Sequence, residues 1–171
     1  MDLIAVGLVT MLGVAVATDV GMRRIPNLVT VGGFGFALFV RGLAGAEPLI
    51  GGLLGAGLGF ALTVPMFAAG GLGGGDVKLL TAVGAFLGPA KFIVAFLATA
   101  IIGAIMAIIV AAHRRALTST LLGTKDLALG VVQRAVRSPV KTELPSLDRP
   151  GGIRNPYGVA IAAGALIGLL Y

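Results

Sequence analysis

Long apolar runs separated by short polar segments make up most of the chain. An apolar run with few charges is typical of a helix that crosses a lipid bilayer. The pattern therefore predicts an all-α, polytopic membrane protein with six transmembrane helices in one domain, residues 1–171. The expected helices cover residues 3–18, 28–43, 49–69, 77–87, 92–112 and, from 156 or 157, the rest of the chain to 171.

The fourth and sixth apolar runs, 77–87 and 156–171, are short. A full crossing takes about 20 residues at a rise of about 1.5 Å per residue. Either the fourth helix begins inside the membrane near Gly73, or the bilayer is thinner around the protein. Both alternatives would bring water and a peptide to a shallow site, and both stay open at this point.

One long polar stretch, residues 113–155, interrupts the apolar pattern before the last run. We expect it to form a cytoplasmic loop between helices five and six. Within this loop, the apolar positions of residues 127–136 suit a short interfacial amphipathic helix, and a basic linker without regular structure is the alternative.

Lysine and arginine are distributed unevenly between the two sides that six crossings would create. Eleven of the 13 basic residues fall on the side of the 113–155 loop, and only Arg41 and Lys91 fall on the opposite side. Because basic loops stay in the cytoplasm, the first side is predicted to be cytoplasmic and both termini to lie outside. The net charge of +6 then reflects membrane orientation and not a nucleic-acid partner.

Composition agrees with a membrane location and excludes several kinds of catalytic and metal site. Hydrophobic residues make up 57% of the chain and charged residues 12%, with a mean hydropathy of +1.04, whereas soluble domains carry about 25% charged residues. The 28 glycines are spread through the apolar runs, where small residues let helices approach closely. Cysteine is absent and His113 is the single histidine, which excludes disulfides, a thiol nucleophile and histidine-rich or cysteine-ligated metal sites.

Asp19 and Asp76 are the candidate catalytic residues. Each lies where an apolar run meets a short polar segment, and on the predicted topology both fall on the cytoplasmic side. Ionisable groups at membrane depth are costly, so they are usually functional. Two carboxylates in one poorly hydrated site can act as an acid and a base, because one keeps its proton while the other is charged.

Each aspartate is followed or preceded by a motif. Asp19 comes before Arg23-Arg24-Ile25-Pro26-Asn27, in which the arginines would anchor a helix end among the headgroups and the proline suits the start of the next helix. Asp76 ends the segment Gly73-Gly74-Gly75-Asp76, where glycines leave room for an extended peptide. Simpler interpretations are a helix-end ion pair for Asp19 and an N-cap for Asp76. The supporting site candidates are Arg23, Arg24, Ile25, Pro26, Asn27, Gly73, Gly75, Lys78 and Pro156.

With these two motifs the chain resembles the type IV prepilin peptidases, a family of GxGD membrane aspartyl proteases. The segment Asp19–Asn27 and the segment Gly73–Lys78 match the two hallmarks of the family, and Asn155-Pro156-Tyr157-Gly158 looks like its motif before the last helix. Larger members carry an N-terminal cytoplasmic region with cysteines, linked to N-methylation. This chain begins at its first apolar run and has no cysteine, so it looks like the short form of Flp/Tad-type pilus systems, without a methyltransferase region.

The resemblance implies a single transmembrane peptidase domain in the bacterial inner membrane. Its activity would be aspartic endopeptidase cleavage of prepilin leaders at the cytoplasmic face, with the bilayer and the prepilin precursor as partners. No cofactor or metal is expected, because two carboxylates offer too few oxygen ligands for a hard cation. Alternatives are another substrate class of GxGD intramembrane protease, a proton relay, and a non-enzymatic subunit of a pilus or secretion system.

Overall fold

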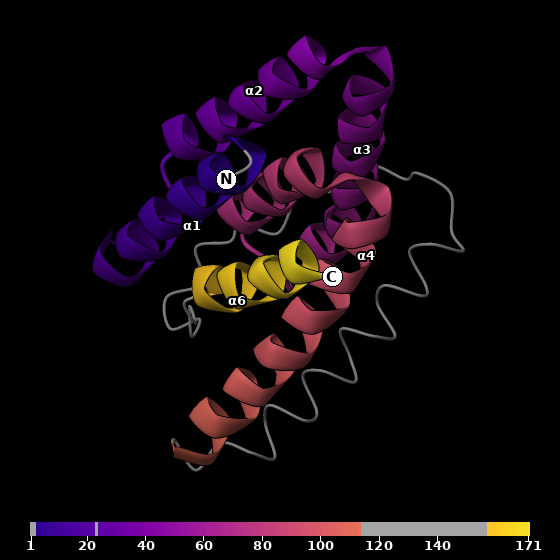
Figure 1. The fold of residues 1–171 in the computed structure, drawn as a ribbon. Helices are drawn as coiled ribbons and strands as arrows, with labels where there is room; N and C mark the ends of the chain where they lie inside the picture. Colours follow the sequence, from indigo (N-terminus) through magenta and orange to yellow (C-terminus); the bar gives the residue numbers. More distant parts are fainter. Residues whose placement is uncertain (1–2, 23, 114–156) are drawn as a thin grey trace, which may run out of the picture.

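A computed structural model describes residues 3–22, 24–113 and 157–171. These described residues form helices and turns without a β-strand, which confirms the all-α prediction (Figure 1). Apart from His113, the expected 113–155 loop with its interfacial helix lies outside the described residues, as do Arg23 and Pro156. The helices are α1 (Leu3–Met22), α2 (Asn27–Ala44), α3 (Ala46–Ala68), α4 (Gly74–His113) and α6 (Tyr157–Leu170).

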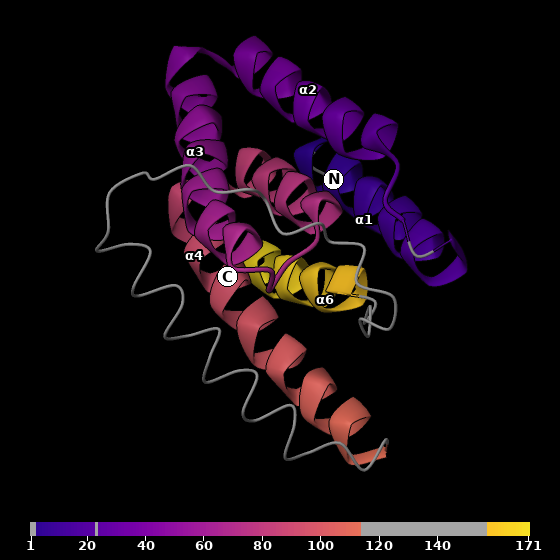
Figure 2. The same ribbon diagram turned by 180° about the vertical axis from the view of Figure 1, so that it is seen from behind.

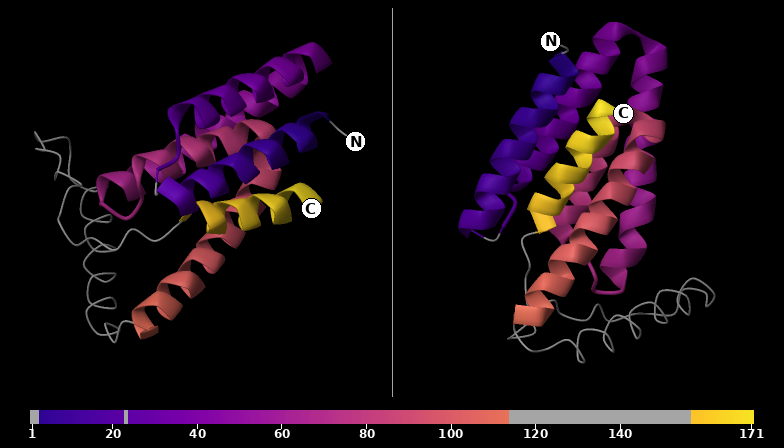
Figure 3. Two further views of the ribbon diagram at one scale, coloured as in Figure 1. Left: turned by 90° about the vertical axis from the view of Figure 1, so that its left-hand side faces the viewer. Right: turned by 60° about the horizontal axis from the view of Figure 1, so that its bottom comes forward.

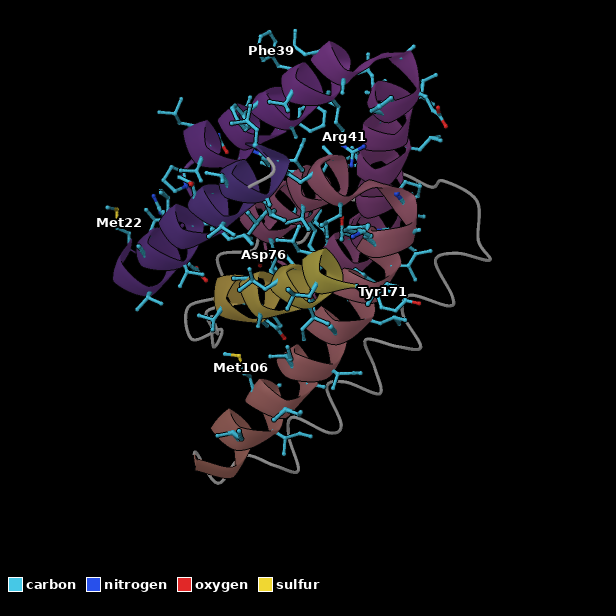
Figure 4. The ribbon with its side chains drawn as sticks, viewed as in Figure 1. Met22, Phe39, Arg41, Asp76, Met106 and Tyr171 are labelled. Carbon is cyan, nitrogen blue, oxygen red and sulfur yellow. The ribbon has the colours of Figure 1, made fainter. Side chains whose placement is uncertain are left out.

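The outer surface of the bundle is apolar. Helices α1 to α4 are each long and apolar enough to cross a membrane, and α6 is a shorter apolar helix of 14 residues. In the view of Figure 4, Phe39 points away from the bundle, and 65% of its surface is exposed. So much exposed apolar surface requires lipid around it, and the chain is therefore an integral membrane protein. Other exposed apolar side chains are Val31, Leu54, Ile101 and Ile108.

Helix α4 is divided at Gly88. The backbone of this residue (φ 75°, ψ 174°) is not helical and lies in a region that favours glycine. Pro89 follows and has no N–H to continue the hydrogen-bond ladder. The two apolar runs predicted at 77–87 and 92–112 are therefore the two halves of α4, and the helix breaks where the sequence predicts a boundary.

The first half of α4, residues 74–87, lies at the centre of the bundle. Helices α2, α3 and α6 pack against α4, and α1 packs against α2 and α6 (Figures 1 and 2). Leu79, Val83 and Phe86 in this half are fully buried. A helix that is apolar on all sides suits the interior of a bundle. The segment that carries Asp76 is therefore enclosed mainly by protein.

Three glycines allow α3 and α4 to touch. A Cβ atom added at Gly55 of α3 would lie 2.8 Å from the Cα atom of Gly88 and would also meet the carbonyl oxygen of Gly84. A larger side chain at position 55 would force the two backbones apart. At this contact the glycines have the packing role that their distribution in the sequence predicts.

Arg41 and Lys91 bind backbone carbonyl groups. Arg41 extends from α2 and donates from Nη1 to the carbonyl oxygen of Pro48 at 3.0 Å and from Nη2 to that of Phe86 at 2.8 Å. The Nζ atom of Lys91 donates to the carbonyl oxygen of Leu169 at 3.5 Å. These are the two basic residues that the sequence assigns to the non-cytoplasmic side, and both stabilise helix ends.

Candidate active site

One end of the bundle collects the segments that carry the two motifs. Helix α1 ends there and α2, α4 and α6 begin there, whereas both termini and the junction between α2 and α3 lie at the other end (Figure 3). We call the first the motif end, defined by residues 19–27, 73–78 and 157–158 where the structure describes them. The second is the far end, defined by residues 41–48, 86–91 and 169–171.

The two motifs contact each other directly. The Nζ atom of Lys78 donates a hydrogen bond to Oδ1 of Asn27 at 2.8 Å. A Cβ atom added at Gly75 would lie 3.5 Å from Cβ of Ile25, so the turn before α4 packs on the link between α1 and α2. Pro26 has extended backbone angles (φ −61°, ψ 137°) and precedes the first residue of α2. The structure thus brings five of the supporting site candidates together.

Asp76 lies in the first turn of α4. Its Oδ2 atom accepts a hydrogen bond from the backbone N–H of Gly73 at 3.1 Å. An acidic side chain that returns to the N–H just before its own helix forms half of a capping box, and it also interacts favourably with the helix dipole. The side chain is half-buried, and in the view of Figure 4 it lies within the outline of the bundle, whereas Met22 lies at the edge.

Asp19 lies in the last turn of α1 and points to the start of α6. Only 9% of its surface is exposed. Its Oδ2 atom accepts a hydrogen bond from the backbone N–H of Gly158 at 2.9 Å, and this bond is buried. The N-terminus of a helix is a favourable place for a carboxylate, because the first N–H groups have no partner within the helix.

Both candidate carboxylates are therefore oriented by backbone N–H groups at helix starts. A carboxyl group that is oriented in this way can accept or donate a proton. General acid–base chemistry needs such groups in defined positions near a reacting bond. The motif end offers two of them, from α1 and α4.

The remaining site candidates differ in what the structure shows. Arg24 is exposed at the motif end. Arg23 and Pro156 are not among the described residues. Within the described ranges, no group of three or more histidine, cysteine, aspartate or glutamate side chains is placed to hold a metal ion.

An apolar cavity of about 450 Å³ lies between α1 and α2. Phe36 and Phe86 contribute to its wall, together with the glycines Gly7, Gly32 and Gly33. Neither Asp19 nor Asp76 lines it. The cavity is therefore distinct from the position of the two carboxylates.

Gly158 is a contact of Asp19 that the sequence did not single out. It stands in the Asn155–Gly158 motif, but the motif does not say which residue it meets. The only available signal was a glycine at the second position of a helix whose start falls on the same side as Asp19. The partner became clear only from the packing of α6 against α1.

Comparisons with known proteins agree with the motifs. The type IV leader peptidase family matches residues 6–108 of the chain. A curated relative from Bacillus subtilis (strain 168), named a prepilin leader peptidase/N-methyltransferase, is 28% identical over 169 residues. This alignment covers 98% of the chain and 55% of the relative, so the chain spans about half of the relative's length. No solved structure matches the chain. Since the family match spans well over half of its residues and includes both aspartate motifs, the chain belongs to the type IV leader peptidase family.

Proposed function

We propose that the protein is a membrane-embedded aspartic endopeptidase that removes the leader peptide of type IV prepilin-like precursors. The main observation behind the proposal is the arrangement of two carboxylates at the motif end. There, two aspartates from separate family motifs are each oriented by a backbone N–H group. Family membership supports the same reaction class.

In the proposed reaction, Asp19 and Asp76 share the proton transfers. The ionised carboxylate takes a proton from a water molecule, and the oxygen of this water attacks the carbonyl carbon of the scissile peptide bond. The protonated carboxyl group donates to the carbonyl oxygen and later helps to protonate the leaving amine. Either aspartate can take either role in this proposal, so the roles belong to the dyad and not to one residue.

The proposed topology has six crossings, with the two halves of α4 counted separately. It places the motif end at the cytoplasmic face and both termini outside. The excess of lysine and arginine on the motif side supports this orientation. The contacts of Arg41 and Lys91 support this orientation further. The two basic residues on the far side donate to carbonyl groups at helix ends, so a structural role accounts for their presence there.

The proposed substrate is a precursor with a leader followed by an apolar helix. The apolar helix would reach the enzyme within the bilayer, and the cleavage site would lie at the cytoplasmic surface. The name of the Bacillus subtilis relative supports a prepilin substrate. The motif Asp19–Asn27 supports the same class.

The test is a cleavage assay in the membrane. The protein is co-expressed with a pilin precursor from its own pilus gene cluster, and the shift from precursor to mature size is followed. Wild type is expected to process the precursor, and Asp19→Asn and Asp76→Asn are each expected to stop processing while accumulating normally. Gly57→Ala is the matched control, since a Cβ atom at this position meets nothing within 4 Å.

The alternatives give different outcomes in the same assay. A proton relay predicts that Asp19→Asn abolishes ion flux and leaves processing intact. A non-enzymatic assembly subunit predicts that neither aspartate variant changes processing. Processing of an unrelated signal-peptide remnant in place of the pilin precursor would indicate another GxGD substrate class.

A further inference from the structure

The last helix of the protein holds the carboxylate of Asp19. The backbone N–H of Gly158 donates to Asp19 Oδ2 at 2.9 Å, in a buried bond between residues 139 positions apart. Helix α6 lies beyond residues 6–108, which the family match covers. A segment outside that match therefore contacts a candidate catalytic group.

The space next to Asp19 admits only a hydrogen atom at position 158. A Cβ atom added at Gly158 would lie 2.7 Å from Oδ2 of Asp19, 3.1 Å from its Cβ and 3.2 Å from its Cγ. The first distance is shorter than real Cβ contacts, so either the carboxylate or α6 would have to move. Glycine at this position thus supplies both the N–H donor and the room that the carboxylate occupies.

Helix α6 is fixed by packing that does not involve Asp19. A Cβ atom at Gly164 would lie 2.6 Å from the carbonyl oxygen of Ala95 and would also meet Oγ1 of Thr99. The ring of Tyr157 lies 3.3 Å from the Cβ position of Gly103. These contacts with the second half of α4 set the position of the Gly158 N–H. Because α6 is held elsewhere, a side chain at position 158 would displace the carboxylate more easily than the helix.

We propose that Gly158 is a positioning residue for Asp19, which fixes the carboxylate in the orientation that proton transfer requires. The inference rests on the proposed peptidase function. Gly158 acts only through Asp19: its N–H holds one carboxylate oxygen and leaves the other for water or the scissile carbonyl. Misplacement of a reacting group by about 1 Å costs about a hundredfold in rate.

The test measures kcat and KM separately, with the full-length protein purified in detergent and a purified pilin precursor from its own cluster. For Gly158→Ala we expect kcat to fall about a hundredfold and KM to stay within about twofold of wild type. The matched control is Leu166→Ala on the same helix, because the side chain of Leu166 is exposed. Its kcat and KM are each expected to stay within about twofold of wild type.

A second variant removes the donor without adding bulk. An ester linkage in place of the peptide N–H of residue 158 deletes the hydrogen bond and leaves the Cα atom without a side chain. Its kcat is expected to fall about tenfold, with KM unchanged. This variant keeps the inference testable even where Gly158→Ala does not fold.

Two results would overturn the inference. One is a kcat near the wild-type value in both the Gly158→Ala and the ester variant, and the other is an equal loss of kcat in Leu166→Ala. Failure of the proposed function looks different, because then wild type does not cleave the precursor or Asp19→Asn cleaves it as wild type does. In that case both proposals are wrong. If Asp19→Asn is inactive but Gly158→Ala cleaves as wild type does, only the proposal for Gly158 is wrong.

Discussion

At the motif end of the bundle, acidic side chains meet the starts of helices. Asp76 accepts the N–H of Gly73 before α4, and Asp19 accepts the N–H of Gly158 in α6. The first N–H groups of a helix have no partner within it, and the dipole there is positive. Both carboxylates thus satisfy groups that the backbone leaves open.

At the far end, basic side chains meet the ends of helices. Arg41 donates to the carbonyl oxygen of Phe86, in the last turn of the first half of α4. Lys91 donates to the carbonyl oxygen of Leu169 near the end of α6. The last carbonyl groups of a helix lack partners, and the dipole there is negative. The far end therefore mirrors the motif end with opposite charges.

The chemical consequences of the two ends differ. A carboxyl group can give and take a proton near neutral pH when its surroundings allow it, whereas a guanidinium group stays protonated. The same principle of satisfying helix ends therefore orients two candidate catalytic carboxylates at one end and produces a structural clamp at the other. The comparison predicts losses of activity at the motif end and losses of stability at the far end.

The largest expected effect is on catalysis at the motif end. Asp19→Asn, Asp76→Asn and the double variant should each lower kcat by about 10²–10⁴-fold, the range that general acid–base groups contribute. The proposed dyad acts as a unit, which predicts that the double variant is no worse than the more damaging single one. Single-turnover cleavage of the precursor measures all three. Losses that multiply in the double variant would show that the aspartates act independently.

The next effect is on stability at the far end. Arg41→Ala removes two donors and should lower the free energy of unfolding by about 3 kcal/mol, since hydrogen bonds to charged groups contribute about 1.5–3 kcal/mol each. Arg41→Lys, which keeps the charge and can reach one carbonyl group, should lose about half as much. Thermal unfolding in detergent measures stability, and cleavage per folded molecule should stay near wild type. A loss of cleavage comparable with the aspartate variants would remove the distinction between the ends.

A smaller effect distinguishes two substitutions of one aspartate. Asp19→Ala leaves the buried N–H of Gly158 without its acceptor and should lower the free energy of unfolding by about 1–3 kcal/mol. Asp19→Asn keeps an oxygen acceptor and should be nearly as stable as wild type. Both should be inactive, so thermal unfolding separates the structural role of Asp19 from its chemical role. Equal stability of the two variants would mean that the bond to Gly158 contributes nothing to folding.

The smallest effect concerns the exposed bond between the motifs. Lys78 and Asn27 are joined at 2.8 Å on the surface, where a hydrogen bond contributes about 0.5 kcal/mol. A double-mutant cycle of Lys78→Ala and Asn27→Ala should give a coupling of about that size in unfolding free energy. A coupling of several kcal/mol would show that this bond, and not only the packing of Gly75 on Ile25, holds the motifs together.

Much of the candidate site could be predicted because its signals are local. An aspartate at the boundary of an apolar run is visible in the sequence, and so is the Gly88-Pro89 step that breaks α4. The cost of a charge at membrane depth singles out Asp19 and Asp76 without any structure. The bond from Gly158 could not be predicted, since nothing near that glycine in the sequence indicates its distant partner.

The sequence by itself determined the membrane class, the all-α fold and the family, because apolar runs, breaks and short motifs depend on neighbouring residues. Only the tertiary structure decided what each motif touches: Lys78 with Asn27, 51 positions away, and Asp19 with Gly158, 139 positions away. It also decided that the first half of α4 is enclosed by the other helices. Apolar helices of similar hydropathy can pack in many orders, and close contacts such as that of Gly55 with Gly84 select one of them.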